Sequence, residues 1–169
     1  MGREFNILVL CQGNSARSIM AEVIINYVGQ GRIHGYSAGS HPKAQPHPIA
    51  LALLASHGHD TSQLRSKSWL AFTEPGAPKV DVVITVCDEA AGEACPYFPG
   101  GPVAVHWGMS DPAASQSEGE GDRLAFERAY DLLERRLRRL AALPDDALQG
   151  SAAFGRLAEI AELEPAGPA

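Results

Sequence analysis

Short apolar runs rich in β-branched residues recur along this chain and constrain its fold more than any other feature. Buried strands are predicted at Phe5–Leu10, Ile33–Ser37 and Val80–Val86, with a weaker fourth at Val103–His106. The runs are continuous rather than strictly alternating, as in the strands of a parallel sheet that is covered on both faces. We therefore expect a mostly parallel sheet at the centre of the protein.

Amphipathic stretches separate these runs and predict helices at Ser18–Val28, His47–Gly58 and Asp122–Leu143. The second of them has a proline near its start and a glycine at its end, an arrangement that helices favour. Strands that alternate with helices form βαβ units. The predicted fold is therefore α/β with three layers, an open four-stranded parallel sheet with helices on both faces, as in flavodoxin-like proteins.

The last predicted helix and the segment after it set the expected domain boundary. The polar face of this helix carries four arginines, which we interpret as a solvated face: Arg135, Arg136, Arg138 and Arg139. We assign residues 1–145 to one catalytic domain and residues 146–169 to a C-terminal extension of unknown role. The extension contains a short amphipathic segment that the sequence does not connect to any chemistry.

The composition excludes several classes of protein. The chain has 169 residues, of which 45% are hydrophobic, and this fits a single globular domain. A net charge of −6 gives no support for a nucleic-acid partner, and no apolar run reaches the ~18 residues that a membrane helix needs. The N-terminal apolar stretch is too short for a secretory signal. We expect a cytoplasmic monomer whose three cysteines are thiols.

The stretch after the first predicted strand reads C-Q-G-N-S-A-R-S and leads directly into the first predicted helix. The backbone N–H groups of such a loop, together with the helix N-terminus, form a cradle for an anion. Gly13 and Asn14 tolerate the unusual backbone angles of a tight loop, and the Arg17 guanidinium can hold two oxygens of an oxyanion. The predicted oxyanion site consists of Gln12, Gly13, Asn14, Ser15, Ala16 and Arg17.

Cys11 lies at the base of this loop, and we predict that it is a nucleophile. The positive surroundings are expected to lower its pKa from ~8.5 to about 3.5–7.5, so that it is a thiolate to which Ser18 can donate its hydroxyl. Cys87 and the segment after His106 also follow predicted strands. Because the carboxyl ends of parallel strands share one edge of a sheet, these residues should gather near Cys11.

The pattern C-x-x-x-x-x-R-S after a strand resembles the low-molecular-weight protein tyrosine phosphatase superfamily. The match includes Cys11, Gly13, Asn14, Arg17 and Ser18, all near the N-terminus. The later stretch H-W-G-M-S-D-P is similar to the Asp-Pro loop of that family. The resemblance implies a low-molecular-weight phosphatase-like fold, and it implies that Asp111 is the general acid that protonates the departing oxygen.

Two further stretches resemble the arsenate reductases built on this phosphatase fold. They read V-C-D-E-A-A-G-E-A-C-P-Y-F-P, from residue 86, and Y-S-A-G-S-H-P, from residue 36, and the resemblance covers roughly residues 5–140. Tyrosine phosphatases of this fold usually have a tyrosine directly after the Asp-Pro pair, where this chain has Ala113 and Ala114. The platform for a phosphotyrosine ring is therefore missing.

The resemblance implies a disulfide relay that starts at Cys11 and reduces arsenate to arsenite. Cys87 would attack the Cys11 sulfur, and Cys95 would then take over the disulfide. An external thiol reductant, thioredoxin or glutaredoxin with glutathione, would restore the thiols, with no tightly bound cofactor and no metal. The spacing departs from that of the thioredoxin-coupled relatives, because seven residues rather than six separate Cys87 from Cys95.

The resemblance also suggests residues that support the loop. Some relatives hold a monovalent cation beside it, and Asn14, Glu22 and Ser37 match ligands of that cation. Lys67 stands where further ligands would be expected. We expect its ammonium group to occupy the place of the cation.

Four alternatives remain open at this point. The chain could be a phosphatase for phosphotyrosine or small phosphoesters, which needs only Cys11, Arg17 and Asp111. It could be a reductase in which Cys11 works with glutathione and glutaredoxin while Cys87 and Cys95 are bystanders. It could be an oxyanion or redox sensor without turnover. A zinc site on the two later cysteines and His106 is a weaker alternative, because the spacing C-x₇-C is unusual for zinc.

Overall fold

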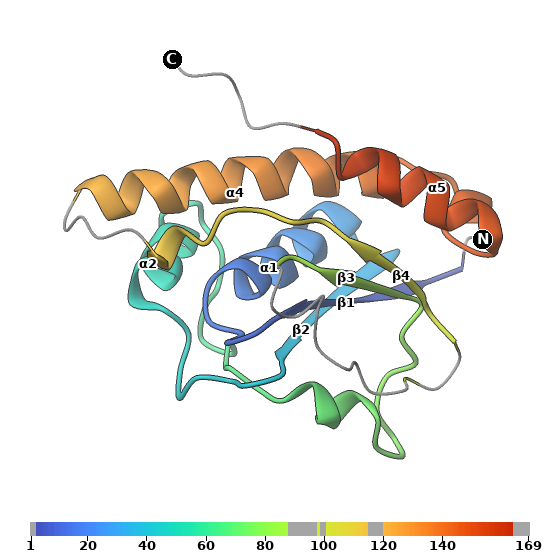
Figure 1. Cartoon of the computed structure of the whole chain (residues 1–169), viewed down its shortest axis with the longest axis horizontal. Helices are drawn as coiled ribbons and strands as arrows, with labels where there is room; N and C mark the ends of the chain where they lie inside the picture. Colours follow the sequence, from blue (N-terminus) through green and yellow to red (C-terminus); the bar gives the residue numbers. More distant parts are fainter. Residues whose placement is uncertain (1–2, 88–97, 99–100, 115–119, 164–169) are drawn as a thin grey trace.

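Four parallel strands form one sheet in the order β2-β1-β3-β4 in a computed structural model of the chain (Figure 1). The structure describes residues 3–87, 98, 101–114 and 120–163. The strands are β1 (Phe5–Cys11), β2 (Ile33–Gly39), β3 (Val82–Thr85) and β4 (Val103–His106). The α-helices are α1 (Arg17–Gly29), α2 (Pro48–Ser56), α4 (Glu120–Ala141) and α5 (Ser151–Ile160). Short 3₁₀ helices are η1 (Trp69–Phe72), η2 (Pro112–Ala114) and η3 (Asp145–Ala147).

The predicted α/β fold with an open four-stranded parallel sheet is confirmed. Each predicted strand and helix is present, with ends that differ from the prediction by at most three residues. β1 is a central strand, since Ile7 pairs with Gly35 of β2 on one side and with Val82 of β3 on the other. β3 then pairs with β4, from Val82 opposite Val103 to Thr85 opposite His106.

Alternate residues of β1 supply two apolar cores. Phe5, Ile7 and Val9 pack into the larger core together with apolar side chains of α1, α2, α4 and α5. Leu8 and Leu10 point to the opposite face. There they meet two aromatic residues of η1, Trp69 and Phe72, and Phe98 from the connection between β3 and β4. Figure 1 shows α1, α4 and α5 on one face of the sheet and η1 on the other.

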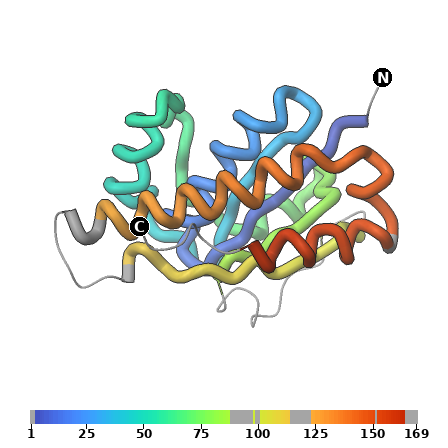
Figure 2. Tube along the Cα trace, turned by 90° about the horizontal axis from the view of Figure 1, so that it is seen from above, coloured from blue at the N-terminus to red at the C-terminus, as the bar shows by residue number. Residues whose placement is uncertain are grey.

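The C-terminal extension is part of the larger core. The amphipathic segment that the sequence left unconnected forms η3 and α5, and its residues Leu148, Ala153 and Leu157 are buried. In Figure 2, α5 (red) runs beside α4 and along the chain segment that contains β4 (yellow). None of the described helices is both long and apolar enough to cross a membrane.

Arg136 corrects the prediction that the arginines of the long helix form a solvated face. Arg135, Arg138 and Arg139 are exposed, but Arg136 is only 5% exposed. Helical periodicity places residues 132, 133, 136, 137 and 140 on one side of α4. Arg136 therefore faces inward with Leu133, Leu137 and Leu140, all of which are buried.

Candidate active site

The loop between β1 and α1 has its carbonyl oxygens turned outward, and this turns its N–H groups inward. The carbonyls of residues 12, 13, 14 and 15 accept hydrogen bonds from His41 N (2.9 Å), Lys43 N (2.9 Å), Ser66 Oγ (2.6 Å) and His47 N (2.8 Å), respectively. A trans peptide has its C=O and N–H on opposite sides. The N–H groups of residues 13–16 therefore point away from these donors, toward the inside of the loop, as an anion cradle requires.

Asn14 fixes the shape of the loop. It has a left-handed backbone (φ 45°) and is completely buried. Its amide nitrogen donates to Ser18 Oγ at 2.8 Å, and its amide oxygen accepts from the backbone N–H of Lys67 at 2.9 Å. Because the Ser18 oxygen accepts this bond, the Ser18 hydroxyl proton remains available for a different acceptor.

Close packing of β2 against the loop requires a glycine at its end. A Cβ at Gly39 would lie 2.5 Å from the carbonyl oxygen of Gln12 and 2.8 Å from that of Cys11. Any side chain at this position would therefore displace the anion loop. The segment between Gly39 and α2 then supplies three of the four donors that hold the loop carbonyls.

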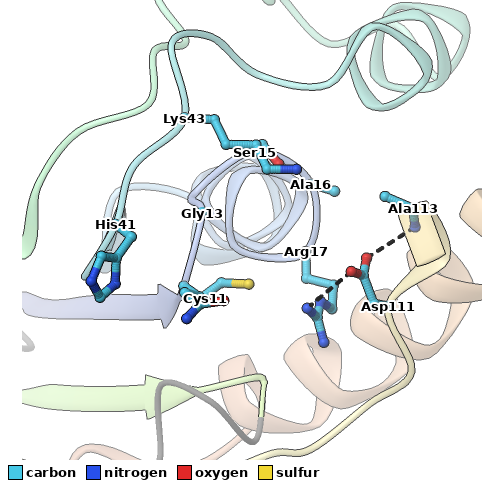
Figure 3. Close-up of a pocket in the computed structure, with 10 residues that line it drawn as sticks. Cys11, Gly13, Ser15, Ala16, Arg17, His41, Lys43, Asp111 and Ala113 are labelled. Atoms are coloured by element: carbon cyan, nitrogen blue, oxygen red, sulfur yellow. Dashed lines mark hydrogen bonds and ion pairs between the residues drawn. The ribbon is translucent and has the colours of Figure 1, made fainter. Parts of the chain in front are cut away.

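Arg17 and Asp111 face each other across the loop (Figure 3). Their side chains form an ion pair of 3.6 Å between Arg17 Nη2 and Asp111 Oδ2, and Arg17 Nη1 donates to the carbonyl of Met109 at 3.0 Å. Arg17 Nε is buried without a partner among the described residues, so one donor of the guanidinium is not used by the protein. Asp111 also accepts from the N–H of Ala113 at 2.9 Å, and 41% of its side chain is exposed.

These residues line a hollow of about 170 Å³ that opens to solvent. Its walls are the loop residues except Asn14, which is buried behind them, together with Asp111, Ala113, His41 and Lys43 (Figure 3). The predicted residues Cys11 and Asp111 are therefore brought together with the loop. Ala113 occupies the wall on the side of Asp111, as expected for a site without an aromatic platform.

His41 and Lys43 line the hollow but were not predicted as site residues from the sequence. The aliphatic carbons of Lys43 lie over Gly13, where a Cβ would come within 3.3 Å of them. Lys43 therefore adds a positive charge at the mouth of the hollow of an acidic protein. One signal for them was available in the sequence: both residues lie just after a predicted strand. Ligands bind at the edge of a parallel sheet where the carboxyl ends of its strands lie.

Cys87 lies against Cys11 beneath the loop. Both are free thiols, Cys11 being 5% exposed and Cys87 completely buried. A hydrogen bond with the Cys87 side chain and burial raise the pKa of Cys11, while the Arg17 charge and the N–H of Gly13 act in the opposite direction. The backbone N–H of Gln12 donates to Cys87 Sγ at 3.2 Å, which favours a negative charge on Cys87.

The predicted low pKa of Cys11 is therefore wrong for this arrangement. The prediction considered the cradle and Arg17, whose effects are present, but not a second sulfur in contact with the first. Two groups that share one site ionise in two steps, and the second proton is held much more tightly than the first.

The predicted support residues meet below Asn14. The Lys67 ammonium lies 3.4 Å from Ser37 Oγ and 3.5 Å from Glu22 Oε1, and it donates to the carbonyl of Arg65 at 2.9 Å. Ser37 in turn donates to the same Glu22 oxygen at 2.6 Å. Burial lowers the pKa of Lys67, whereas the Glu22 carboxylate raises it.

Cys95 and the whole segment from residue 88 to 97 lie outside the described residues. His106, the remaining residue of the zinc alternative, contacts Thr85, with 2.8 Å between His106 Nδ1 and Thr85 Oγ1. Within the part of the chain that the structure describes, no three His, Cys, Asp or Glu side chains are grouped as a metal site would need.

The sequence profile of one protein family matches residues 6–151 of this chain, and its description is low molecular weight phosphotyrosine protein phosphatase. The chain belongs to this family. The anion loop, Arg17 and Asp111 thus lie inside the matched region, whereas almost all of α5 lies beyond it.

Arsenate reductases are prominent among the relatives within this family. An arsenate reductase of Halalkalibacterium halodurans is 33% identical over 141 residues, which cover 80% of this chain and 94% of that protein. A solved arsenate reductase in the phosphate-binding state has a TM-score of 0.64 and 29% identity, and the match covers 82% of this chain and 97% of that one. The tyrosine phosphatase Wzb from Escherichia coli K30, solved with sulphate, shares the fold with a TM-score of 0.62 at 19% identity, over 80% of this chain and 95% of that one.

Proposed function

We propose that this protein is an arsenate reductase that uses Cys11 and Cys87 in a thiol relay. The observation that carries the proposal is the second thiol: Cys87 Sγ accepts a hydrogen bond from the backbone N–H of Gln12 at 3.2 Å, which places it beside Cys11 at the base of the anion loop. A phosphatase needs one cysteine at this place. A reductase with an internal thiol relay needs a second one close enough to form a disulfide with the first. The arsenate reductase relatives support the same choice of substrate.

In the first step, arsenate binds in the hollow and the Cys11 thiolate attacks arsenic. A sulfur–arsenic bond forms while one arsenic–oxygen bond breaks. The departing oxygen takes a proton from Asp111 and leaves as water. Arg17 and the inward N–H groups of the loop hold the remaining oxygens, and the Ser18 hydroxyl is available to stabilise the Cys11 thiolate before attack.

In the second step, the Cys87 thiolate attacks the Cys11 sulfur. A disulfide forms, the sulfur–arsenic bond breaks, and its electron pair stays on arsenic, which is thereby reduced from As(V) to As(III) and leaves as arsenite. The two thiols supply both electrons. The hydrogen bond from Gln12 N–H to Cys87 Sγ supports this step, because it favours the thiolate form that Cys87 needs.

In the third step, Cys95 attacks Cys87 and an external dithiol reduces the resulting Cys87–Cys95 disulfide. Cys87 is completely buried in the structure, so a reductant cannot reach a Cys11–Cys87 disulfide without a movement of the chain. The third step therefore requires the chain to move around Cys87. Thioredoxin, or glutaredoxin with glutathione, has the required chemistry, and the cytoplasm supplies both kinds of reductant.

Turnover of cysteine variants tests the proposal. With arsenate and a dithiol reductant, the wild type should release arsenite repeatedly, whereas Cys11→Ala and Cys87→Ala should fall to background. Hydrolysis of p-nitrophenyl phosphate is the matched control, since it needs Cys11 but not Cys87. Arsenite release by Cys87→Ala at the wild-type rate would contradict the relay and favour a reductase that uses an external thiol directly.

Slow phosphoester hydrolysis is a second activity that the site supports. Cys11, Arg17 and Asp111 lie in one hollow and suffice for it. The wall after Asp111 is formed by Ala113 rather than an aromatic ring, so an aryl group would gain little binding energy there. We therefore expect hydrolysis to be a weak side activity.

We further propose that the Lys67 ammonium replaces a monovalent cation beside the loop. Its contacts with Ser37 and Glu22 are those a cation would make. A Lys67→Glu variant would place a second carboxylate next to that of Glu22. Its rate of arsenite release should then be higher with potassium than with choline as the only monovalent cation. Lys79→Glu, at an exposed position, controls for the change in net charge. A Lys67→Glu enzyme without any potassium response would contradict this proposal.

A further inference from the structure

Arg136 is a buried cation that joins two segments far apart in the sequence. Its Nη1 donates to the carbonyls of Trp107 and Gly108, both at 3.3 Å. Its Nη2 donates to the carbonyls of Ala161 (2.9 Å) and Leu163 (3.2 Å), just beyond the C-terminal end of α5. The guanidinium therefore connects the first residues of the segment that carries Asp111 to the end of the C-terminal helix.

Trp107 makes a second connection between the same two segments. Its side chain is 1% exposed, and its indole Nε1 donates to the carbonyl of Leu157, within α5, at 2.9 Å. Its backbone N–H also donates to Thr85 of β3 at 2.7 Å. Trp107 is thus fixed on one side by the sheet and on the other by α5.

The segment that continues from Trp107 to Asp111 also contacts the active site, and its Met109 packs against the larger core. Met109 donates its N–H to the carbonyl of Val86 at 3.3 Å and accepts from Arg17 at 3.0 Å. Asp111 follows two residues later, in its ion pair with Arg17. The place of the carboxyl group therefore depends on two anchors, Arg17 at one end and the Trp107–Arg136–α5 contacts at the other.

We infer that Arg136 and Trp107, together with α5, are positioning residues that hold the Asp111 segment over the anion loop. The inference rests on the proposed acid role of Asp111. A guanidinium stays charged when buried, and its removal would leave four carbonyls without the donor that joins them, so the segment would lose this attachment to the end of α5. Almost all of α5 lies beyond the residues that the family profile matches, so this anchor of the proposed general acid lies outside the matched region.

A double-mutant cycle with Asp111→Asn tests whether Arg136 acts through Asp111. Arg136→Met should lower kcat for arsenate about tenfold to a hundredfold, because small misplacements of a catalytic group have effects of that size. KM should stay within about twofold, since the anion loop is intact. In the Asp111→Asn background the same change should have no further effect on kcat. Arg135→Met, at an exposed position on the same helix, should leave kcat unchanged.

Hydrogen exchange supplies a readout that is independent of activity. Amides of residues 107–113 should exchange faster in Arg136→Met and in Trp107→Phe, which removes the indole donor and leaves a smaller aromatic ring in the core. The full chain is used throughout. Trp69→Phe, on the opposite face of the sheet, and Arg135→Met should leave this exchange unchanged.

The outcomes separate the inference from the proposed function. If Asp111→Asn keeps the wild-type kcat, the acid role of Asp111 is wrong and the inference falls with it. If Asp111→Asn is slow but Arg136→Met is as fast as the wild type, the inference alone is overturned. It is also overturned if Arg136→Met lowers kcat equally in both backgrounds, or if exchange in residues 107–113 does not change in either variant.

Discussion

Two sulfur atoms lie side by side at the base of the anion loop, where the proposed chemistry requires a thiolate. Cys11 is surrounded by an arginine and inward N–H groups, yet contact with Cys87 keeps its proton in place. The backbone N–H of Gln12 donates to Cys87 Sγ and so favours a negative charge on Cys87 rather than on Cys11. The arrangement suits the second proposed step, in which Cys87 is the attacking thiolate. For the first step the charge must move to Cys11, and a Cys87 that turns away would allow this.

Removal of the Cys87 sulfur should therefore lower the pKa of Cys11. In Cys87→Ala the raising effects of the hydrogen bond and of the neighbouring charge disappear, while those of Arg17 and Gly13 remain. The midpoint pH for alkylation of Cys11 by iodoacetamide should fall by about one unit or more, as for other directly coupled groups. The measurement follows the Cys11 peptide by mass spectrometry over a pH series. An unchanged or higher midpoint would show that Cys87 does not hold the proton on Cys11.

At the scale of elements, the C-terminal end of α4 is held by a cluster of charged groups. Arg32, which precedes β2, donates to the carbonyls of Ala141 (3.1 Å) and Leu143 (2.6 Å), where a helix end favours a positive charge. Asp145 in η3 accepts from Arg32 Nε at 2.9 Å and from the N–H of Arg3 at 3.1 Å. The cluster joins the start of the chain, β2 and the extension.

This cluster predicts a pH dependence of stability. The hydrogen bond from Arg32 and that from the N–H of Arg3 lower the pKa of Asp145 in the folded protein. A carboxyl group with a depressed folded pKa stabilises the fold above its unfolded pKa of about 3.9, and the stabilisation is lost as the pH falls through the folded value. Asp145→Asn should therefore lower Tm by a few degrees at neutral pH, and the difference from the wild type should shrink below about pH 4.

Thermal unfolding at several pH values, followed by circular dichroism, measures this effect. Asp146→Asn removes the exposed neighbouring carboxyl group and should leave Tm nearly unchanged at neutral pH. A difference between Asp145→Asn and the wild type that persists undiminished at acidic pH would contradict the assignment of the effect to the ionised carboxylate.

At the scale of the whole molecule, the fold and the anion loop could be predicted because each has a local signal, whereas the roles proposed for Asp111 and Cys87 were implied by a family resemblance. Continuous apolar runs identify parallel strands, and the parallel topology brings Cys11, Cys87 and Asp111 to one sheet edge. The anion loop has a spacing that no ordinary turn needs. These features depend on neighbours in the sequence or on a general rule of sheet topology.

Features that depend on distant contacts could not be predicted. The pKa of Cys11 depends on a thiol that follows a different strand, and the burial of Arg136 depends on carbonyls that directly follow β4 and α5. An arginine within an R-R-L-R-R run has the same local pattern whether it is solvated or buried. Its role becomes visible only when the C-terminal extension is seen against Trp107.

The most direct test of the central claim is a disulfide map of the fully reduced protein after arsenate is added without any reductant. Phosphate serves as the matched anion. We predict that arsenate alone removes two hydrogens from the intact mass, with the bond at Cys87–Cys95 in the wild type and at Cys11–Cys87 in Cys95→Ser. A protein that stays fully reduced with arsenate, or that oxidises equally with phosphate, would contradict the Cys11–Cys87 relay.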